Sequence, residues 1–217
     1  MLDTTNPVVL LLIIVISLVS YKGFEDFGFF EKYKFQVNRI RNGEKIRMVS
    51  SGFLHANWMH LIFNMYALYL FGDIVSKSLS DLKFFLIYFG SLVAGSVYSL
   101  YYHRREPYYS AIGASGAVSG VVYSSILLHP ERELGLIFIP VYIPGYIIGV
   151  AYLLYTIYGM KKRVGNIGHS AHLGGAIGGF GLTLAINPQL FNENFPMVIA
   201  LSIPIMILIF FGDKLNI

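Results

Sequence analysis

The sequence of 217 residues contains no cysteine and little charge. Without cysteine there is no disulfide framework, no thiol nucleophile and no cysteine-ligated zinc, so the sequence carries no sign of its redox compartment. Charged residues make up 13% of the chain, against roughly 25% in soluble domains, while hydrophobic residues reach 55%. Too few polar side chains remain to cover a soluble surface. These shortages exclude a disordered chain, a nucleic-acid-binding domain and an ordinary cytosolic enzyme, and they indicate an integral membrane protein.

The few charged residues are placed so that seven long uncharged runs lie between them. The runs are 4–21, 48–72, 84–103, 107–130, 134–160, 164–192 and 194–212. Because a membrane-spanning helix needs about 20 mostly apolar residues, each run is a candidate span. We expect helices near 7–21, 58–75, 82–102, 115–129, 142–160, 167–186 and 195–211. The first run lacks a basic start and a small-residue cleavage site, so it is predicted to be a retained span rather than a signal peptide.

The predicted fold is an all-α, polytopic membrane helical bundle. The chain shows no internal repeat, so residues 1–217 are predicted to form a single membrane-embedded domain. Its core is expected at about 7–186, with one extra helix at about 195–211. The longest connection, 22–56, holds 7 of the 16 basic residues and a cluster of aromatic side chains. It is predicted to lie at the membrane interface, and a solvated loop is the alternative.

Polar side chains within the predicted spans are few, and each one costs free energy unless it is paired or functional. Those that stand out as candidates are His60, Asn64, Ser115, Ser119, His169, Ser170 and His172. All of them fall on the second, fourth and sixth spans, which begin on the same side of the membrane in a simple back-and-forth topology. His60, Ser115 and His172 lie near the starts of their helices. We therefore expect these three side chains at a similar depth on one side.

Helical spacing adds glycine faces beside these polar residues. His60 and Asn64 are four residues apart and share a face. Small residues at this spacing let helix backbones approach closely in a membrane. The predicted helix-packing glycines are Gly113, Gly116, Gly120, Gly175 and Gly179. They can bring a serine on one helix to a histidine on another, although such glycines often only pack helices.

A serine hydroxyl needs a base to become a nucleophile, and histidine is the side chain suited to this near neutral pH. Ser115 and His172 supply both parts. No carboxylate lies near His172 in sequence, so the pattern favours a dyad over a triad. Backbone N–H groups where the Ser115 helix begins, with His60 and Asn64, could stabilise an oxyanion.

Two alternatives stand beside this interpretation. A lone serine in a span often bonds to its own helix, and a lone histidine is often a strut between helices. Metal binding is the other alternative, with His55, His60, His169 and His172 as the candidate ligands. The sequence has no H-E-x-x-H motif and no acidic residue near these histidines, so the spacing for a metal is poor.

Three segments carry a resemblance to a known family. They are His55-Ala-Asn-Trp-Met-His60-Leu-Ile-Phe-Asn64, Gly113-Ala-Ser115-Gly116-Ala and Ala171-His172-Leu-Gly-Gly175-Ala-Ile-Gly-Gly179. In this order, on the second, fourth and sixth spans, they resemble the signatures of the rhomboid intramembrane serine proteases. The resemblance covers about residues 45–186 and implies six core helices plus one at the C-terminal end.

The resemblance also implies roles for individual residues. Ser115 matches the nucleophile and His172 the general base. His60, Asn64 and the backbone at Ala114 and Ser115 match the oxyanion hole. The family cleaves transmembrane protein substrates within the lipid bilayer, with no cofactor, metal or nucleic acid, through a cavity that admits water. Substrates enter near the fifth helix.

This chain departs from the family pattern in two places. Ile46 stands before Arg47, where the family often has tryptophan. Ser119 replaces an aromatic residue that sometimes follows the nucleophile by one turn and stacks on the base. Ser119-Gly120 imitates the nucleophile motif, but residue 117 is alanine rather than glycine, so Ser115 remains the predicted nucleophile.

The family orientation, with the N-terminus inside, would leave 13 Lys/Arg outside and 3 inside, against the positive-inside tendency. The side of cleavage therefore stays open, as does the oligomeric state. The predicted location is the cell membrane, as a multi-pass protein. The predicted function is intramembrane serine endopeptidase. A relative that binds membrane clients without cutting is the second possibility, although it would have lost the serine or the histidine. A transporter is the third, but the sequence shows none of the repeats or acidic ion sites expected for one.

Overall fold

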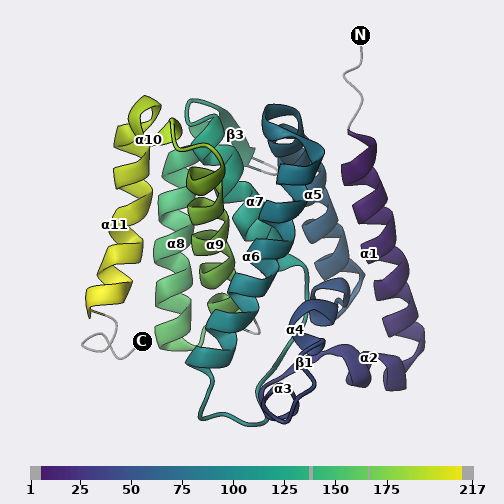
Figure 1. The fold of residues 1–217 in the computed structure, drawn as a ribbon. Helices are drawn as coiled ribbons and strands as arrows, with labels where there is room; N and C mark the ends of the chain where they lie inside the picture. The colour runs from purple at the N-terminus through teal and green to yellow at the C-terminus, as the bar shows by residue number, and fades with distance from the viewer. Residues whose placement is uncertain (1–5, 137–138, 166, 212–217) are drawn as a thin grey trace.

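A computed structural model describes residues 6–136, 139–165 and 167–211 and shows a helical bundle (Figure 1). The long helices are α1 (Pro7–Glu25), α5 (Trp58–Leu79), α6 (Asp81–Tyr102), α7 (Ser115–Leu128), α8 (Gly145–Lys162), α9 (His169–Ile186) and α11 (Phe195–Phe211). Each of the seven predicted spans coincides with one of these helices, so the all-α prediction is confirmed. Helix α1 flanks α5 at one edge of the bundle, and α11 packs on α8 at the other edge.

Short elements connect the long helices. The short helices in the described chain are α2 (Phe27–Tyr33), α3 (Val37–Arg41), α4 (Arg47–Ser50), η1 (Ser51–Phe53) and α10 (Leu190–Glu193). The strands are β1 (Phe35–Gln36), β2 (Ser110–Ala111), β3 (Glu133–Leu136) and β4 (Ile139–Pro144). Strand β1 pairs antiparallel with β2, and β3 pairs antiparallel with β4. The first pair ties the long first connection to the segment that leads into α7.

Three described helices, α1, α5 and α6, are long and apolar enough to cross a membrane by length and composition alone. Helix α7 is apolar but has 14 residues, which gives a length of about 21 Å at 1.5 Å per residue. This is shorter than the roughly 30 Å hydrocarbon core. Eleven of its residues are buried, so protein rather than lipid surrounds most of it. Helix α7 is therefore the central helix, and its serines and glycines are sheltered from hydrocarbon.

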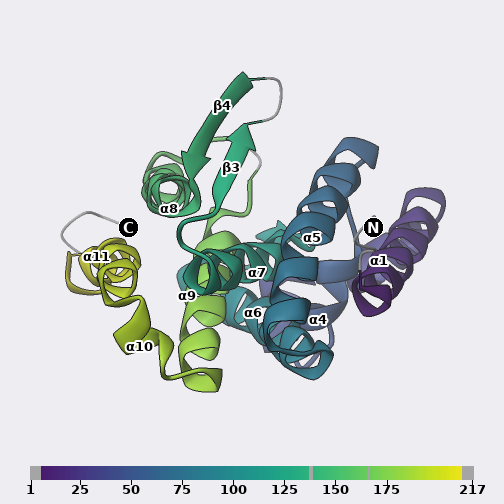
Figure 2. The same cartoon turned by 90° about the horizontal axis from the view of Figure 1, so that it is seen from above.

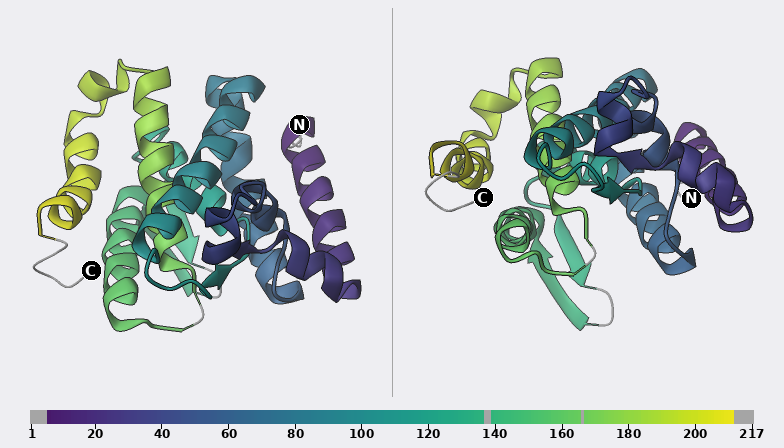
Figure 3. Two further views of the ribbon diagram at one scale, coloured as in Figure 1. Left: turned by 60° about the horizontal axis from the view of Figure 1, so that its bottom comes forward. Right: turned by 90° about the horizontal axis from the view of Figure 1, so that it is seen from below.

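The fifth long helix begins slightly later than its expected start. The sequence predicted a helix near 142–160, and α8 begins at Gly145. Pro144 has no N–H, and it disfavours helical geometry in the residue before it, so the chain stays extended through β4. The Gly145 N–H donates to the Arg132 carbonyl over 2.9 Å, which closes the base of the β3–β4 hairpin. The hairpin projects away from the bundle beside α8 (Figures 2 and 3).

The connection between α1 and α5 folds onto the bundle. The buried side chains of Phe35, Val37 and Ile40 form a small core there. Phe27, in contrast, is 77% exposed. One face of the connection thus packs on the bundle, while the Phe27 side chain stays exposed. Its location at the membrane interface remains a prediction.

Arg47 holds this connection together from inside. The Arg47 side chain is 5% exposed and donates from Nε to Glu44 Oε2 over 2.6 Å. Its Nη1 donates to the carbonyl oxygens of Glu31 and Lys34, both over 2.8 Å. Guanidinium groups present several donors in a fixed fork, so one buried side chain can join separate turns of the loop. Ile46, which stands where the family often has tryptophan, is 63% exposed.

Helices α7 and α9 touch backbone to backbone. A Cβ atom on Gly175 would lie 2.0 Å from the Gly116 carbonyl oxygen, and one on Gly179 would lie 2.3 Å from the Gly120 carbonyl oxygen. No side chain fits at such distances, so only glycine allows this approach. The contact fixes the spacing between the helix that carries Ser115 and the helix that carries His172.

Candidate active site

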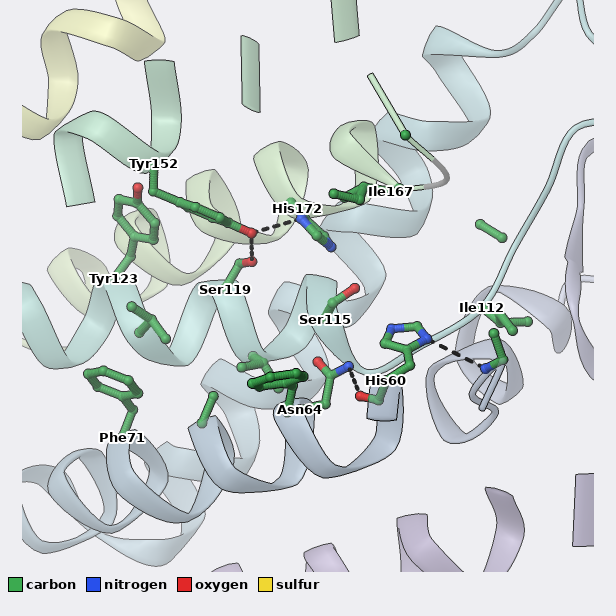
Figure 4. Close-up of a pocket in the computed structure, with 18 of the residues that line it drawn as sticks. His60, Asn64, Phe71, Ile112, Ser115, Ser119, Tyr123, Tyr152, Ile167 and His172 are labelled. Carbon is green, nitrogen blue, oxygen red and sulfur yellow. Dashed lines mark hydrogen bonds between the residues drawn. The ribbon is translucent and has the colours of Figure 1, made fainter. Parts of the chain in front are cut away.

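The three polar motifs lie on helices that begin at the same end of the bundle. Asn57 caps α5, and its side chain accepts from the His60 N–H over 2.9 Å. Ser115 is the first residue of α7, and His172 lies in the first turn of α9. Because each side chain sits close to a helix start, all three come to a similar level. They line one cavity of about 1000 Å³ (Figure 4).

Ser115 points into this cavity between the two histidines. Figure 4 shows the Ser115 hydroxyl between the rings of His172 and His60. Within the described part of the chain, no hydrogen bond joins the Ser115 hydroxyl to His172. The structure thus brings the predicted nucleophile and base to one cavity as neighbours.

Position 113, two residues before Ser115, must be glycine. Gly113 has a φ of +118°, which side chains rarely tolerate, and a Cβ there would lie 2.9 Å from His60 Nε2 and 3.6 Å from Ser115 Oγ. The missing side chain leaves a small space that the His60 ring and the Ser115 hydroxyl share.

His60 and Asn64 present N–H groups toward the cavity. The Ala56 N–H faces His60 Nδ1 over 3.5 Å, which makes Nδ1 an acceptor and leaves the hydrogen on Nε2. Asn64 is 7% exposed and donates one amide hydrogen to the His60 carbonyl over 2.9 Å. Among the described residues, no partner takes its second amide hydrogen. Both side chains can therefore donate to an anion beside Ser115.

The Ala114 N–H, one of the predicted oxyanion donors, points elsewhere in this structure. It faces Nε2 of His55 over 3.4 Å. Since Nε2 accepts there, Nδ1 carries the hydrogen and donates to the Ser20 hydroxyl over 2.8 Å. The Ser20 hydroxyl in turn donates to the Phe53 carbonyl over 2.8 Å. A donor role for Ala114 remains a prediction that would require this N–H to change partner.

His55 is a site residue whose role the sequence analysis missed. It lies in the loop before α5, is 1% exposed and packs edge-on against His60, with ring centroids 4.9 Å apart. Burial and the neighbouring His60 lower the pKa of His55 to about 3. A neutral His55 thus supports the turn before Ser115 and the His60 ring together. The five-residue spacing from His55 to His60 was the available signal.

His172 has a partner that the sequence did not reveal. Its Nδ1 lies 2.7 Å from the hydroxyl of Tyr152 on α8, and the two rings are stacked with centroids 6.1 Å apart. The Tyr152 hydroxyl also lies 3.5 Å from the Ser119 hydroxyl (Figure 4). The aromatic neighbour that the family pattern places one turn after the serine is here supplied by another helix.

The cavity continues from the polar groups into an apolar part. That part is lined by Phe71, Val122, Tyr123, Ile126, Ile148 and Gly149. These residues come from α5, α7 and α8. Mostly apolar walls with a few polar groups are typical of ligand-binding cavities.

The histidines do not gather into a metal site. Among residues 6–136, 139–165 and 167–211, no three His, Asp or Glu side chains are grouped to hold a metal ion. His169 is 5% exposed, and its Nε2 lies 3.1 Å from the Val164 carbonyl, in the turn between α8 and α9. Its ring lies against Gly159 of α8. The metal hypothesis finds no ligand set in these residues.

Comparison with known proteins identifies the family. Residues 42–189 match the sequence profile of the rhomboid domain, and this region contains every predicted site residue. The chain belongs to the rhomboid family. It is therefore a multi-pass membrane protein of a family that includes intramembrane serine proteases.

Individual rhomboids share moderate sequence identity with this chain. Rhomboid protein 1, mitochondrial, of Saccharomyces cerevisiae is 34% identical over 138 residues, which are 62% of this chain and 40% of the yeast protein. RHOMBOID-like protein 12, mitochondrial, of Arabidopsis thaliana is 29% identical over 174 residues, 73% of this chain and 51% of the relative. Rhomboid protease GluP of Bacillus subtilis is 34% identical over 141 residues, 65% of this chain and 26% of the relative. This chain thus spans about half, or less, of the length of these relatives.

Proposed function

We propose that this rhomboid is an active intramembrane serine endopeptidase with a Ser115–His172 dyad. The observation that carries the proposal is the placement of the Ser115 hydroxyl, at the start of a buried helix, between His172 and a histidine that can donate from Nε2. The residues proposed as nucleophile, base and anion donors thus line one cavity. Such a combination is what acyl transfer from a peptide requires.

The chemical steps follow from these positions. As the Ser115 oxygen attacks the peptide carbonyl carbon, its proton passes to His172 Nε2. The carbonyl oxygen becomes negative and accepts hydrogen bonds from His60 Nε2, Asn64 Nδ2 and the backbone N–H of Ser115. His172 then gives its proton to the leaving amine. A water molecule attacks the acyl-serine with His172 again as base, which releases the acid and restores the enzyme.

The substrate class follows from the cavity and the membrane setting. The apolar part of the cavity suits peptide side chains from a transmembrane segment, so we propose transmembrane proteins as substrates. The cell membrane is the proposed location. Two of the relatives are named as mitochondrial, so recovery of the protein in an organelle membrane would correct this part of the proposal.

The test is cleavage of a single-span substrate by the purified full chain in bilayer vesicles. Ser115→Ala and His172→Ala should each lower kcat/KM by several orders of magnitude, because either change removes the dyad. Asn64→Ala should be milder, with a loss of up to about 10²-fold. Ser125→Ala is the matched control, since Ser125 is buried on the same helix and does not line the cavity.

The outcomes separate the candidate functions. Wild-type cleavage that persists in Ser115→Ala would contradict the dyad. A wild-type protein that binds the substrate without cutting it, and that leaves a fluorophosphonate serine probe unreacted, would instead identify a non-catalytic client-binding rhomboid.

A further inference from the structure

The second nitrogen of the His172 ring has a defined partner. Nδ1 lies 2.7 Å from the Tyr152 hydroxyl. Tyr152 projects from α8 across the cavity wall, and its ring lies nearly parallel to the imidazole, with an interplanar angle of 24°. The hydrogen bond and the stacking act on the same ring, so Tyr152 controls both its rotation and its tilt (Figure 4).

The direction of this hydrogen bond follows from the proposed role of His172 as the base that takes the serine proton. To take a proton from serine, His172 must present an unprotonated Nε2, so its hydrogen must sit on Nδ1. An Nδ1–H group needs an acceptor, and the Tyr152 oxygen is placed to be that acceptor. The hydroxyl hydrogen of Tyr152 is then free to point to Ser119, whose oxygen lies 3.5 Å away.

No charged group competes for this position. The hydrogen bonds of the described residues give His172 Nδ1 no carboxylate partner, and the fold instead offers a hydroxyl from a neighbouring helix. A hydroxyl can accept from Nδ1–H before the reaction. It can also accept from the same N–H when the ring becomes a cation. It thereby orients the ring in both states without bringing a buried negative charge into the bundle.

We propose that Tyr152 is a positioning residue that holds His172 in the Nδ1–H tautomer, with Nε2 facing Ser115 and with Ser119 as the next member of the chain. The catalytic meaning of this proposal rests on the proposed dyad. The position of the ring hydrogen, however, is a property of the folded protein that is measured without any substrate.

The first measurement is kinetic, on the full chain in bilayer vesicles. Tyr152→Phe keeps the aromatic ring and removes the hydroxyl. Loss of one uncharged hydrogen bond should lower kcat about tenfold, and KM should change less than twofold because the substrate pocket keeps its shape. Tyr158→Phe is the matched control on the same helix, because Tyr158 is 55% exposed and does not line the cavity. Equal kcat values in Tyr152→Phe and Tyr158→Phe would overturn the proposal.

The second measurement reads the tautomer directly. In protein labelled with ¹⁵N-histidine, the His172 signals are those that disappear in His172→Ala. They should report a neutral ring with hydrogen on Nδ1 in the wild type, and a shift toward the Nε2–H form in Tyr152→Phe. A wild-type ring with hydrogen on Nε2, or a tautomer unchanged by Tyr152→Phe, would refute the proposal.

The two proposals fail in different ways. If Ser115→Ala still cuts the substrate, the dyad is wrong, whereas the NMR result still decides the role of Tyr152. If Ser115→Ala is inactive and Tyr152→Phe behaves as Tyr158→Phe does, the dyad stands and Tyr152 only packs against the ring.

Discussion

Replacing Gly175 with alanine should force apart the helices that carry the predicted nucleophile and base. The new Cβ would lie 2.0 Å from the Gly116 carbonyl oxygen, only one residue from Ser115, whereas 3.4 Å is an ordinary contact. The obstacle is backbone, which cannot rotate away as a side chain can. Helices α7 and α9 must therefore separate or shift by about 1.4 Å to restore a normal contact.

The size of the effect follows from this displacement. A misplacement of about 1 Å between reacting groups can cost about 10²-fold in rate, so kcat should fall at least that far. Overpacking of a tight core also costs about 1–3 kcal/mol of stability. Gly175→Ala should therefore lower both the melting temperature and the cleavage rate, although neither Ser115 nor His172 is itself replaced.

Helix α9 offers a matched control. Gly181 lies on the same helix, and a Cβ there would meet no atom within 4 Å. Gly181→Ala should leave cleavage unchanged and stabilise the helix by about 0.5–1 kcal/mol. Thermal unfolding in detergent and cleavage in vesicles would be measured for both variants. If Gly175→Ala matched Gly181→Ala in both assays, the backbone contact would not set the spacing of the site.

Two further predictions concern the loops around the site. Acid should weaken the fold through His55, because the pKa of His55 is about 3 in the folded protein and 6.5 ordinarily. Between these pH values the unfolded chain binds more protons than the folded one. The free energy of unfolding should therefore fall by about 1.4 kcal/mol for each pH unit by which the pH is lowered. Melting temperatures between pH 7 and pH 4 would show this slope, and His55→Gln should flatten it; identical slopes would contradict the assignment. Arg47→Gln should cost about 1–3 kcal/mol, because the carbonyl oxygens of Glu31 and Lys34 lose their donor. Arg39→Gln removes an ion pair in which the Arg39 side chain is 59% exposed, so it should cost less than about 1 kcal/mol in the same unfolding experiment. Equal losses in the two variants would argue against a stabilising role for the buried Arg47 side chain.

The sequence predicted the helices well because membrane spans follow from the scarcity of charge. Uncharged runs and bilayer thickness are properties of the chain alone, and they located all seven long helices. The later start of α8 was not predicted because hydropathy does not register how Pro144 holds the preceding backbone extended. The same uncharged run therefore contains part of a hairpin as well as a helix.

The site was partly predictable for a related reason. Ser115, His60 and His172 stood out as polar residues in apolar segments, and alternation of helices placed them at one end. Tyr152 did not stand out, because α8 carries several tyrosines and only the rotation of α8 against α9 decides which one reaches His172. Arg47 was equally hidden, since its carbonyl partners are backbone groups that exist as a set only after the loop has folded.

The packing of α9 has a consequence for how the protein is made. Helix α9 packs on both α6 and α7, and the Ser99 hydroxyl of α6 lies 2.9 Å from that of Ser170 of α9, 71 residues later in the chain. During synthesis, α6 and α7 are made before α9, so their contacts with α9 form only after this helix has been added. Under the proposed dyad, Ser115 would lack its base throughout that interval. A growing chain would then be unable to cut its neighbours, and the proposed hydrolysis would begin only after α9 has packed.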